Sequence, residues 1–232
     1  MISIILPVYN EAKILRTNIL KLTKYMDNFE EKYEIIIADD GSTDNTNKIA
    51  KNLISEKIHY LHSAKRVGRG ATLNKVMAKN AKGDIIIYMD ADLATDLYHI
   101  QELVLKIKQG ADICTGSRLI KNSKVSKRSF LRGFFSRSYN IFLKILFNGK
   151  INDHQCGFKA FRKSTVVQVL GKVEATHWFW DTELLIRAQK YGLKLSEIPV
   201  IWNDRDSSQS KVNLFSDVVH MGVAALSLRS KL

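Results

Sequence analysis

Short apolar runs alternate with helical patterns through the first half of the chain. Five short runs that contain isoleucine and other apolar residues predict strands at Ile2–Leu6, Tyr33–Ala38, Lys57–Leu61, Asp84–Met89 and Asp112–Thr115. Between them, apolar residues recur at helical spacing and predict helices over Ala12–Met26 (with Asn10 as N-cap), Thr43–Ile54, Ala71–Ala81 and Leu97–Lys108. Because the strands lack polar alternation, helices should cover both faces of the sheet. The pattern therefore predicts an α/β fold built on a mostly parallel sheet.

The second half of the chain has a different pattern. Phe130–Phe147 places aromatic and aliphatic residues at helical spacing with basic residues between them, and it follows a polar, basic link at Lys121–Arg128. The remaining segments are predicted as an irregular stretch over 151–161, a helix at Asp181–Tyr191, a strand at Leu195–Val200, a polar loop at Asn203–Lys211 and a helix from Leu214. With two prolines and no clear linker, residues 1–232 are expected to form one domain.

Composition narrows the class of protein. Hydrophobic residues make up 45% and charged residues 25%, which is typical of a folded globule and excludes a disordered chain, a collagen or a small disulfide scaffold. Cys114 and Cys156 have apolar or glycine neighbours and are expected to be buried thiols in a reducing compartment. The apolar stretch Val218–Leu228 falls short of the ~20 residues of a membrane span, and Ile2–Val8 lacks the basic start of a signal peptide. We expect a cytosolic chain, able to touch a membrane from outside.

The positive charge is concentrated in the second half. The formal net charge is +13, of which residues 1–116 carry +1 and residues 117–232 carry +12. Residues 117–163 hold 12 basic side chains and a single acid, Asp153. Such asymmetry indicates a polyanionic partner, which from charge alone is nucleic acid, an anionic membrane face or a phosphorylated substrate.

Three polar clusters follow predicted strands. Pro7–Ala12 (PVYNEA) follows the first strand, Asp39–Asp44 (DDGSTD) the second and Asp90–Asp92 (DAD) the fourth. Each cluster alone is equally typical of a turn or a helix cap. In an open parallel sheet, however, ligands bind at the carboxyl ends of the strands, and three clusters at that one edge indicate a binding site.

The DAD cluster indicates a metal and a phosphorylated ligand. Two carboxylates separated by one residue repel each other unless a cation lies between them. Carboxylate oxygens suit Mg²⁺ or Mn²⁺, and Mg²⁺ typically binds one or two carboxylates together with substrate phosphates. The cluster therefore predicts a divalent cation and a donor that carries phosphates, such as a nucleotide.

Taken in order, the motifs resemble those of the family 2 glycosyltransferases, which have the GT-A fold. The resemblance is carried by PVYNEA, DDGSTDNT, KRVGRGATLN, DADLATD and TGSR. The later motifs DHQCGFKAF, WFWDTELL and SEIPVIW are similar to those of polyprenyl-phosphate-hexose synthases, especially the dolichyl-phosphate glucosyltransferase-like branch. The resemblance covers nearly the whole chain and implies a GT-A (Rossmann-like) sheet, with a donor half over 1–116 and an acceptor half over 117–232.

The resemblance also implies roles for particular residues. It assigns nucleotide binding to Pro7, Tyr9, Glu11, Asp39, Asp40, Gly68 and Asp90, the metal to Asp90 and Asp92, catalysis to Asp92, Arg118 and Asp181, and the acceptor phosphate to Arg132, Ser136, Arg137 and Lys211. Two positions depart from the family pattern. Mannose-transferring relatives often carry Gln where this chain has Ala94, which favours the glucose-type branch, and the usual Gly-Ser-Lys reads Gln209–Ser210–Lys211.

The basic helix has two interpretations that fit together. Arg132 and Ser136 share a helical face, as a phosphate-binding pair requires. Basic residues interleaved with phenylalanine are also typical of a helix that lies in a membrane interface, here about residues 126–149. The alternatives are arginines with solvated head groups and phenylalanines that pack in the core.

The expected reaction follows from the acceptor. A phosphate monoester is charged at neutral pH and can attack the anomeric carbon without a general base, so direct displacement with inversion is expected. In that case Asp181 orients an arginine or a sugar hydroxyl, unless Asp181 and Glu183 are simply first-turn helix carboxylates.

These expectations combine into one hypothesis and two alternatives. The hypothesis is a peripheral enzyme on the cytoplasmic face of an anionic membrane that moves a hexose from a UDP-glucose-type donor or GDP-mannose to polyprenyl (dolichyl) phosphate. One alternative is a family 2 enzyme with a saccharide or glycan acceptor. The other is a basic nucleic-acid- or membrane-binding protein without catalysis, and we expect no nucleic acid because no binding motif is present. The sequence leaves open the sugar, the base and a membrane-anchoring subunit.

Overall fold

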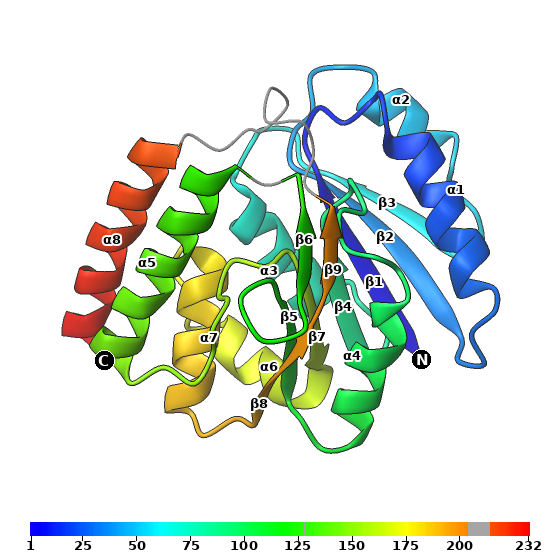
Figure 1. The fold of residues 1–232 in the computed structure, drawn as a ribbon. Coiled ribbons are helices and arrows are strands. Elements are labelled where there is room, and N and C mark those ends of the chain that lie inside the picture. The colour runs from blue at the N-terminus through cyan, green and yellow to red at the C-terminus, as the bar shows by residue number, and fades with distance from the viewer. Residues whose placement is uncertain (128, 204–213) are drawn as a thin grey trace.

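The computed structural model describes residues 1–127, 129–203 and 214–232, in which helices and strands alternate as expected (Figure 1). The strands are β1 (Ile2–Val8), β2 (Tyr33–Asp39), β3 (Ile58–His62), β4 (Ile85–Met89), β5 (Ile113–Ser117), β6 (Lys124–Ser126), β7 (Phe158–Arg162), β8 (Leu195–Pro199) and β9 (Ile201–Asn203). The helices are α1 (Leu15–Met26), α2 (Thr46–Lys51), α3 (Arg69–Lys79), α4 (His99–Lys108), α5 (Phe130–Phe147), α6 (Lys163–Leu170), α7 (Trp180–Lys190) and α8 (Leu214–Lys231). Every helix and strand predicted from the sequence is present, with ends shifted by a few residues.

Seven strands form the central sheet in the order β3-β2-β1-β4-β7-β5-β8. The pairs β1–β2, β1–β4, β2–β3 and β5–β8 are parallel, and β7 runs antiparallel to both β4 and β5. The expectation of a mostly parallel sheet is therefore confirmed. Because β1, β2 and β4 point the same way, the three polar clusters that follow them meet at one edge of the sheet, at the top in Figure 1.

Strand β7 corrects the prediction of an irregular stretch over 151–161. Phe158 and Ala160 face one side of the sheet and Phe161 faces the other, so the alternation of a buried strand is present. Lys159 interrupts the apolar run, yet its side chain is fully buried. A lysine in the middle of a central strand hides the strand from a hydrophobicity pattern, because lysine is almost never fully buried unless it is paired.

Helices cover both faces of the sheet. On one face α1, α2 and α4 pack against apolar side chains of β1, β2 and β4, and on the other α3, α6 and α7 enclose a second cluster with Tyr88, Phe161 and Trp180. A third cluster joins α5, α7 and α8 through Leu143, Ile186 and Ala225. Figure 1 shows α5 and α8 side by side, both starting at the edge where the parallel strands end.

Two smaller expectations need correction, and a third is not tested. Asn10 is not the N-cap of α1, because the helix starts at Leu15 and Ile14 occupies the cap position. The basic link at Lys121–Arg128 contains β6, which pairs in parallel with β9. The predicted polar loop falls, beyond Asn203, outside the described residues, and Lys211 lies outside them too.

Candidate active site

The first two polar clusters are fastened to each other by hydrogen bonds. The backbone N–H of Asn10 donates to Ser42 Oγ (2.9 Å), and the side-chain oxygen of Asn10 accepts from the N–H groups of Thr43 (2.8 Å) and Asp44 (3.3 Å). Asn10 itself has a left-handed backbone (φ 53°), which asparagine tolerates better than most residues. The two loops therefore form one surface at the strand ends.

Asp39 lies fully buried at the end of β2. Its carboxylate accepts hydrogen bonds from Tyr60 Oη (2.6 Å) and from the Ser42 N–H (2.9 Å), and His62 Nδ1 lies 3.2 Å from Oδ2. Burial and the adjacent Asp39 carboxylate raise the pKa of Tyr60 well above its usual value. Tyr60 and His62 were missed from the sequence. Their spacing of two places them on the same face of β3, but the predicted third strand ended at Leu61.

Asp40 organises the loop that precedes α3. Its buried carboxylate accepts from the N–H groups of Val67 (2.8 Å) and Gly68 (3.0 Å) and from Thr72 Oγ1 (3.0 Å). Gly68 has a positive φ of 105°, and a Cβ there would lie 2.3 Å from the Thr176 oxygen, so glycine is required. These contacts explain Asp40 and Gly68 structurally, and their predicted contacts with a nucleotide stay predictions.

The remaining predicted nucleotide residues lie at the same edge. Pro7, Tyr9 and Glu11 are half-buried where β1 ends. The guanidinium of Arg66 stacks over the Tyr9 ring at 4.2 Å from its centroid. A half-exposed aromatic ring can stack on a planar group of a ligand, and a cation held against that ring can attract negative charge on the same ligand.

Asp90 is held from two sides. Its Oδ1 accepts from Arg69 Nη2 (3.0 Å), and its N–H donates to the Gly157 oxygen (3.0 Å). A Cβ at Gly157 would lie 1.9 Å from Asp90 Oδ2, so only glycine allows this carboxylate its position. The DHQCGFKAF motif thus supplies the space that the DAD motif needs.

Asp92 lies on a strained turn. It is half-buried, its Oδ1 accepts from the Ala94 N–H (3.1 Å), and Leu93 between them has a left-handed φ of 52°. Such backbone strain, unusual for leucine, concentrates at functional sites. Asn18 on α1 donates to the Ala91 oxygen (2.8 Å) and fixes the turn from outside.

The two carboxylates fit a metal ion whose remaining ligands come from a substrate. Among the described residues, no group of three or more His, Cys, Asp or Glu side chains is arranged to hold a metal ion. Asp90 and Asp92 supply hard oxygen donors on one turn, and Asp90 remains about one-third exposed. This donor set suits Mg²⁺ or Mn²⁺ bound jointly by protein carboxylates and ligand phosphates.

A buried ionic network lies directly behind Asp90. Asp181, 3% exposed at the start of α7, accepts from Tyr88 Oη (2.5 Å), Lys159 Nζ (2.8 Å) and Arg69 Nη1 (2.9 Å). Burial opposes ionisation, but Lys159 and Arg69 outweigh it and lower the pKa of Asp181 below its usual value. An ionised carboxylate with three donors on it is a poor general base, whereas it can orient Arg69, and the expected contact with an arginine is present.

Arg118, which follows β5, forms an ion pair with Asp153. Its Nε (2.7 Å) and Nη2 (2.9 Å) donate to both oxygens of Asp153, and the guanidinium stacks on Trp202 at 4.9 Å. Although burial raises the pKa of Asp153, Arg118 outweighs it and holds that pKa at about 2. Because both side chains are buried, the loss of either one would leave an uncompensated charge in the interior. Arg118 therefore anchors the turn at 153–157, and its expected catalytic role stays a prediction.

The predicted acceptor residues are divided between two sides of α5. Ser136 is buried, and its Oγ has no hydrogen-bond partner among the described residues, while Arg132 one turn earlier is half-buried. Arg137 is exposed. Tyr139 Oη lies 3.2 Å from Thr182 Oγ1, so α5 is joined to the helix that carries Asp181. The structure brings Arg132 and Ser136 together and leaves Arg137 apart.

The outer side of α5 and α8 exposes large apolar side chains. We call this surface the α5–α8 apolar face and define it by Phe130, Leu131, Phe134, Ile141, Ile145, Val219, Val223 and Leu226. Phe130 is 85% and Ile145 82% exposed. Within the described residues, no helix combines the length and the apolar character that crossing a bilayer requires.

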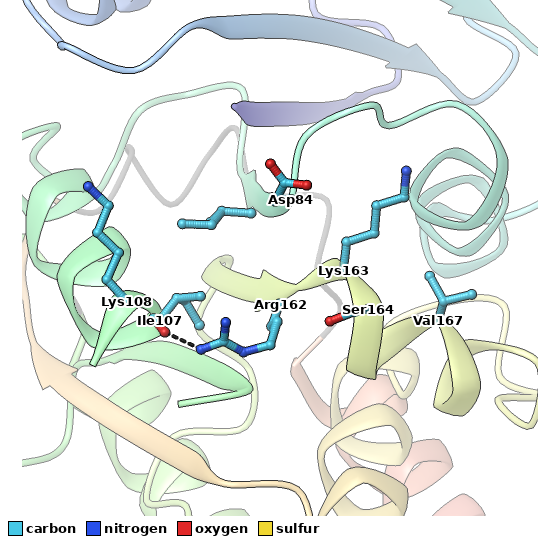
Figure 2. Close-up of a pocket in the computed structure, with 8 residues that line it drawn as sticks. Asp84, Ile107, Lys108, Arg162, Lys163, Ser164 and Val167 are labelled. Atoms are coloured by element: carbon cyan, nitrogen blue, oxygen red, sulfur yellow. Dashed lines mark hydrogen bonds between the residues drawn. The ribbon is translucent and has the colours of Figure 1, made fainter. Parts of the chain in front are cut away.

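A surface pocket of about 560 Å³ lies elsewhere, at the start of β4 and therefore at the opposite edge of the sheet (Figure 2). Its basic lining residues have partners within the chain. Arg162 donates to the Ile107 oxygen, as Figure 2 shows, Lys163 to the Ala81 oxygen (2.6 Å), and Lys108 pairs with Glu31. This pocket is separate from the motif edge and is not the candidate site.

Comparison with known proteins follows the same motifs. The family described as glycosyl transferase family 2 matches residues 3–170. Glycosyltransferase AglD of Haloferax volcanii is 39% identical over 226 residues, which cover 95% of this chain and 36% of AglD. The dolichyl-phosphate beta-glucosyltransferase of Dictyostelium discoideum is 32% identical over 98% of this chain and 73% of its own length. The chain thus spans about a third of AglD and most of the second relative.

A solved structure shares the fold. Glucosyl-3-phosphoglycerate synthase from Mycobacterium tuberculosis, in complex with Mn²⁺, uridine diphosphate and phosphoglyceric acid, superposes with a TM-score of 0.67. The superposition covers 99% of this chain and 78% of the synthase, at 17% sequence identity. The expected GT-A architecture is therefore confirmed.

Proposed function

Because the chain belongs to glycosyl transferase family 2, we propose that it transfers a hexose, with inversion, from a nucleotide diphosphate sugar to a polyprenyl (dolichyl-type) phosphate. The observation that carries the proposal is the pairing of two features. One is a carboxylate edge at Asp90 and Asp92 that suits a diphosphate. The other is a helix whose Arg132 and buried Ser136 Oγ, which has no hydrogen-bond partner within the described part of the chain, suit a second phosphate. The names of the relatives agree with a dolichyl-phosphate acceptor.

The donor half is assigned to residues 1–116. We assign the base and ribose to Pro7, Tyr9, Glu11 and Asp39, which lie at or just beyond the ends of β1 and β2. Asp90 and Asp92 would hold a divalent cation, Mg²⁺ or Mn²⁺, which when bound neutralises charge on the departing nucleoside diphosphate. A glucosyl donor is favoured by Ala94 and by relatives named glucosyltransferases. Arg69, fixed beside Asp90, supplies a further cation at the same place.

The acceptor half is assigned to residues 117–232. A phosphate monoester carries about −1.5 to −2 charges at pH 7, so it attacks the anomeric carbon without losing a proton to the enzyme. The occupied carboxylate of Asp181 agrees with a reaction that needs no general base. Arg132 would grip the phosphate with two parallel hydrogen bonds, and Ser136 would donate a third.

The membrane supplies the acceptor, and the α5–α8 apolar face is the surface we assign to it. Helix α5 contains Arg132, Arg137 and Lys144 and no acidic residue, so an apolar face is framed by positive charge. Such a helix binds an anionic lipid surface through buried apolar area and electrostatic attraction. The enzyme would then be peripheral on the cytoplasmic face, with a membrane-anchoring subunit as an additional partner.

The test is a panel of donors and acceptors. Purified protein with Mn²⁺ or Mg²⁺ is given UDP-glucose, UDP-N-acetylglucosamine or GDP-mannose, each with a short polyprenyl phosphate or with free saccharides, and products are read by mass spectrometry. We expect a lipid-phosphate-linked hexose, most rapidly from UDP-glucose. Saccharide products without lipid product would establish the alternative acceptor class. Tight binding of DNA in a filter assay, together with no transfer, would support the non-catalytic alternative.

A further inference from the structure

Lys159 is a fully buried lysine whose ammonium group points into the ionic network behind Asp90. Its Nζ donates to Asp181 Oδ1 (2.8 Å) and to the Cys156 oxygen (2.5 Å), and it lies 3.5 Å from Tyr88 Oη. Each of its three protons therefore has an acceptor within reach. The position on β7, between β4 and β5, puts this charge in the middle of the sheet.

A charge at this depth is not explained by stability. Burying an ammonium group costs several kcal/mol, and replacing a buried ion pair by apolar side chains of similar volume is often neutral or stabilising. The surroundings are apolar and aromatic, with Tyr88, Phe161 and Trp180 in the same cluster. The pair of Lys159 with Asp181 thus places two charges in an otherwise apolar layer, and a functional explanation for it is to be sought in what the pair contacts.

The contacts of Lys159 lead to the metal carboxylate in two ways. Through Asp181, they reach Arg69, whose Nη2 donates to Asp90 Oδ1 (3.0 Å). The second way is through the Cys156 oxygen. The residue after Cys156 is Gly157, whose backbone oxygen accepts from the Asp90 N–H (3.0 Å), so the contact with Cys156 fixes the backbone beside Asp90. Arg69 keeps a 17% exposed side chain, so its guanidinium faces both the network and the site.

We propose that Lys159 is a positioning residue for the transfer reaction: it fixes Asp181 and thereby holds the Arg69 guanidinium against Asp90, toward the leaving diphosphate. This proposal rests on the proposed function. Arg69 is then the cation that meets developing charge on the leaving group, in a place set before the donor arrives. Preorganised charge of this kind acts on the transition state more than on donor binding.

A double-mutant cycle tests the proposal. Lys159→Met, Arg69→Met and the double variant are compared in steady-state transfer, in donor hydrolysis by water and in calorimetric binding of uridine diphosphate with Mn²⁺. We expect Lys159→Met to lower kcat at least thirtyfold, with donor KM and nucleotide affinity changed less than threefold. The double variant should be no slower than Arg69→Met alone, because both changes remove the same positioned guanidinium.

Controls separate positioning from folding. Lys163→Met removes a lysine that also donates to a backbone oxygen, at the opposite edge of the sheet, and should leave kcat unchanged. Thermal unfolding and circular dichroism show whether each variant is folded. If Lys159→Met does not fold, Lys159→Gln keeps a donor beside Asp181, and the same non-additivity with Arg69→Met is required.

The outcomes separate a failure of the positioning role from a failure of the proposed function. Effects of Lys159 and Arg69 that multiply, or a loss confined to donor KM, would overturn the positioning role while leaving the proposed function intact. A wild-type protein that hydrolyses nucleotide sugar but forms no lipid product would overturn the acceptor assignment, and the cycle on donor hydrolysis would still test Lys159.

Discussion

The donor edge and the acceptor region of this protein are built in opposite ways. At the donor edge, the polar groups of Asn10, Asp39 and Asp40 are engaged by neighbouring loops and strands. In the acceptor region, Ser136 is buried without a hydrogen-bond partner among the described residues, and large apolar side chains of α5 and α8 face outward. The comparison teaches that the donor site is preorganised by the chain itself, whereas the acceptor region is shaped for something that comes from outside.

The expected contributions of the two regions to the stability of the fold agree with this difference. A hydrogen bond within the chain typically contributes ~0.5–1.5 kcal/mol, while a buried polar group without a partner costs ~1–3 kcal/mol. Exposed phenylalanine and isoleucine forgo burial worth ~1.5–3 kcal/mol each. The donor edge therefore adds to stability, and the acceptor region gives stability up in exchange for binding.

The largest expected effect lies at the donor edge. We expect Asp92→Ala to reduce transfer at least about a thousandfold, roughly 4 kcal/mol in the transition state, because the diphosphate then faces the remaining carboxylates without its metal. The fold should persist, since Asp92 is half-buried on a turn. Initial rates with and without EDTA are the measurement, and Asp96→Ala on the same loop is the control. Full activity in excess EDTA would contradict the metal assignment.

The next effect tests whether a membrane covers the acceptor region. The double variant Phe130→Ser/Ile145→Ser should weaken binding to anionic liposomes about thirtyfold, roughly 2 kcal/mol, because two exposed side chains lose their burial in lipid. Sedimentation with vesicles at increasing salt measures it, and salt should release the wild-type protein, since each nearby Lys or Arg contributes ~1 kcal/mol of screened attraction. Leu20→Ser, at an exposed apolar position on α1, is the control. Liposome binding that depends neither on lipid charge nor on salt concentration would contradict the assignment of this face to an anionic membrane.

How far the sequence predicts this molecule depends on where the information lies. Mostly apolar runs such as Ile2–Leu6 and Asp84–Met89 identify strands, because both faces of a parallel sheet are buried. Strand β7 was missed because Lys159 breaks its run, and a buried lysine is understandable only once Asp181 is seen beside it. Local patterns thus predict elements that are held by hydrophobic burial, and they fail where an ion pair replaces it.

The candidate site shows the same division. Motifs at strand ends placed Asp39, Asp90 and Asp92 at one edge, since strand direction alone fixes that edge. Arg69 and Tyr88, which complete the network, were not assigned a role, because their partners lie more than 90 residues away along the chain. The pairing of Arg118 with Asp153, which are 35 residues apart, was hidden as well, because no local pattern links two residues brought together only by the fold.

A smaller effect probes the phosphate grip of α5. We expect Arg132→Lys to lower kcat/KM for polyprenyl phosphate at least tenfold, about 1.4 kcal/mol, because lysine cannot reproduce two parallel hydrogen bonds to phosphate. Nucleotide affinity, measured by calorimetry, should barely change. Arg229→Lys on α8 is the control for loss of a guanidinium on the same side of the molecule. Lost nucleotide affinity with unchanged lipid kinetics would move this arginine to the donor site.

The change with the smallest expected effect on transfer separates the two regions most directly. Ser136→Ala removes a buried hydroxyl that has no partner among the described residues, so the free protein should become more stable, by up to ~1–3 kcal/mol. The same change should reduce use of polyprenyl phosphate only about threefold, because one neutral donor to a phosphate is lost. Thermal unfolding midpoints and lipid kinetics are measured on the same preparation, and Ser138→Ala, exposed two residues later, should alter neither.

The opposite signs of these two changes are what the comparison requires. A serine that only completes the packing of α5 would destabilise the protein when replaced, or leave the lipid kinetics untouched. A serine that waits for a ligand costs stability in the free protein and contributes to binding when the phosphate arrives. If Ser136→Ala lowers the unfolding midpoint, the hydroxyl has a structural partner, and the acceptor region is as self-contained as the donor edge.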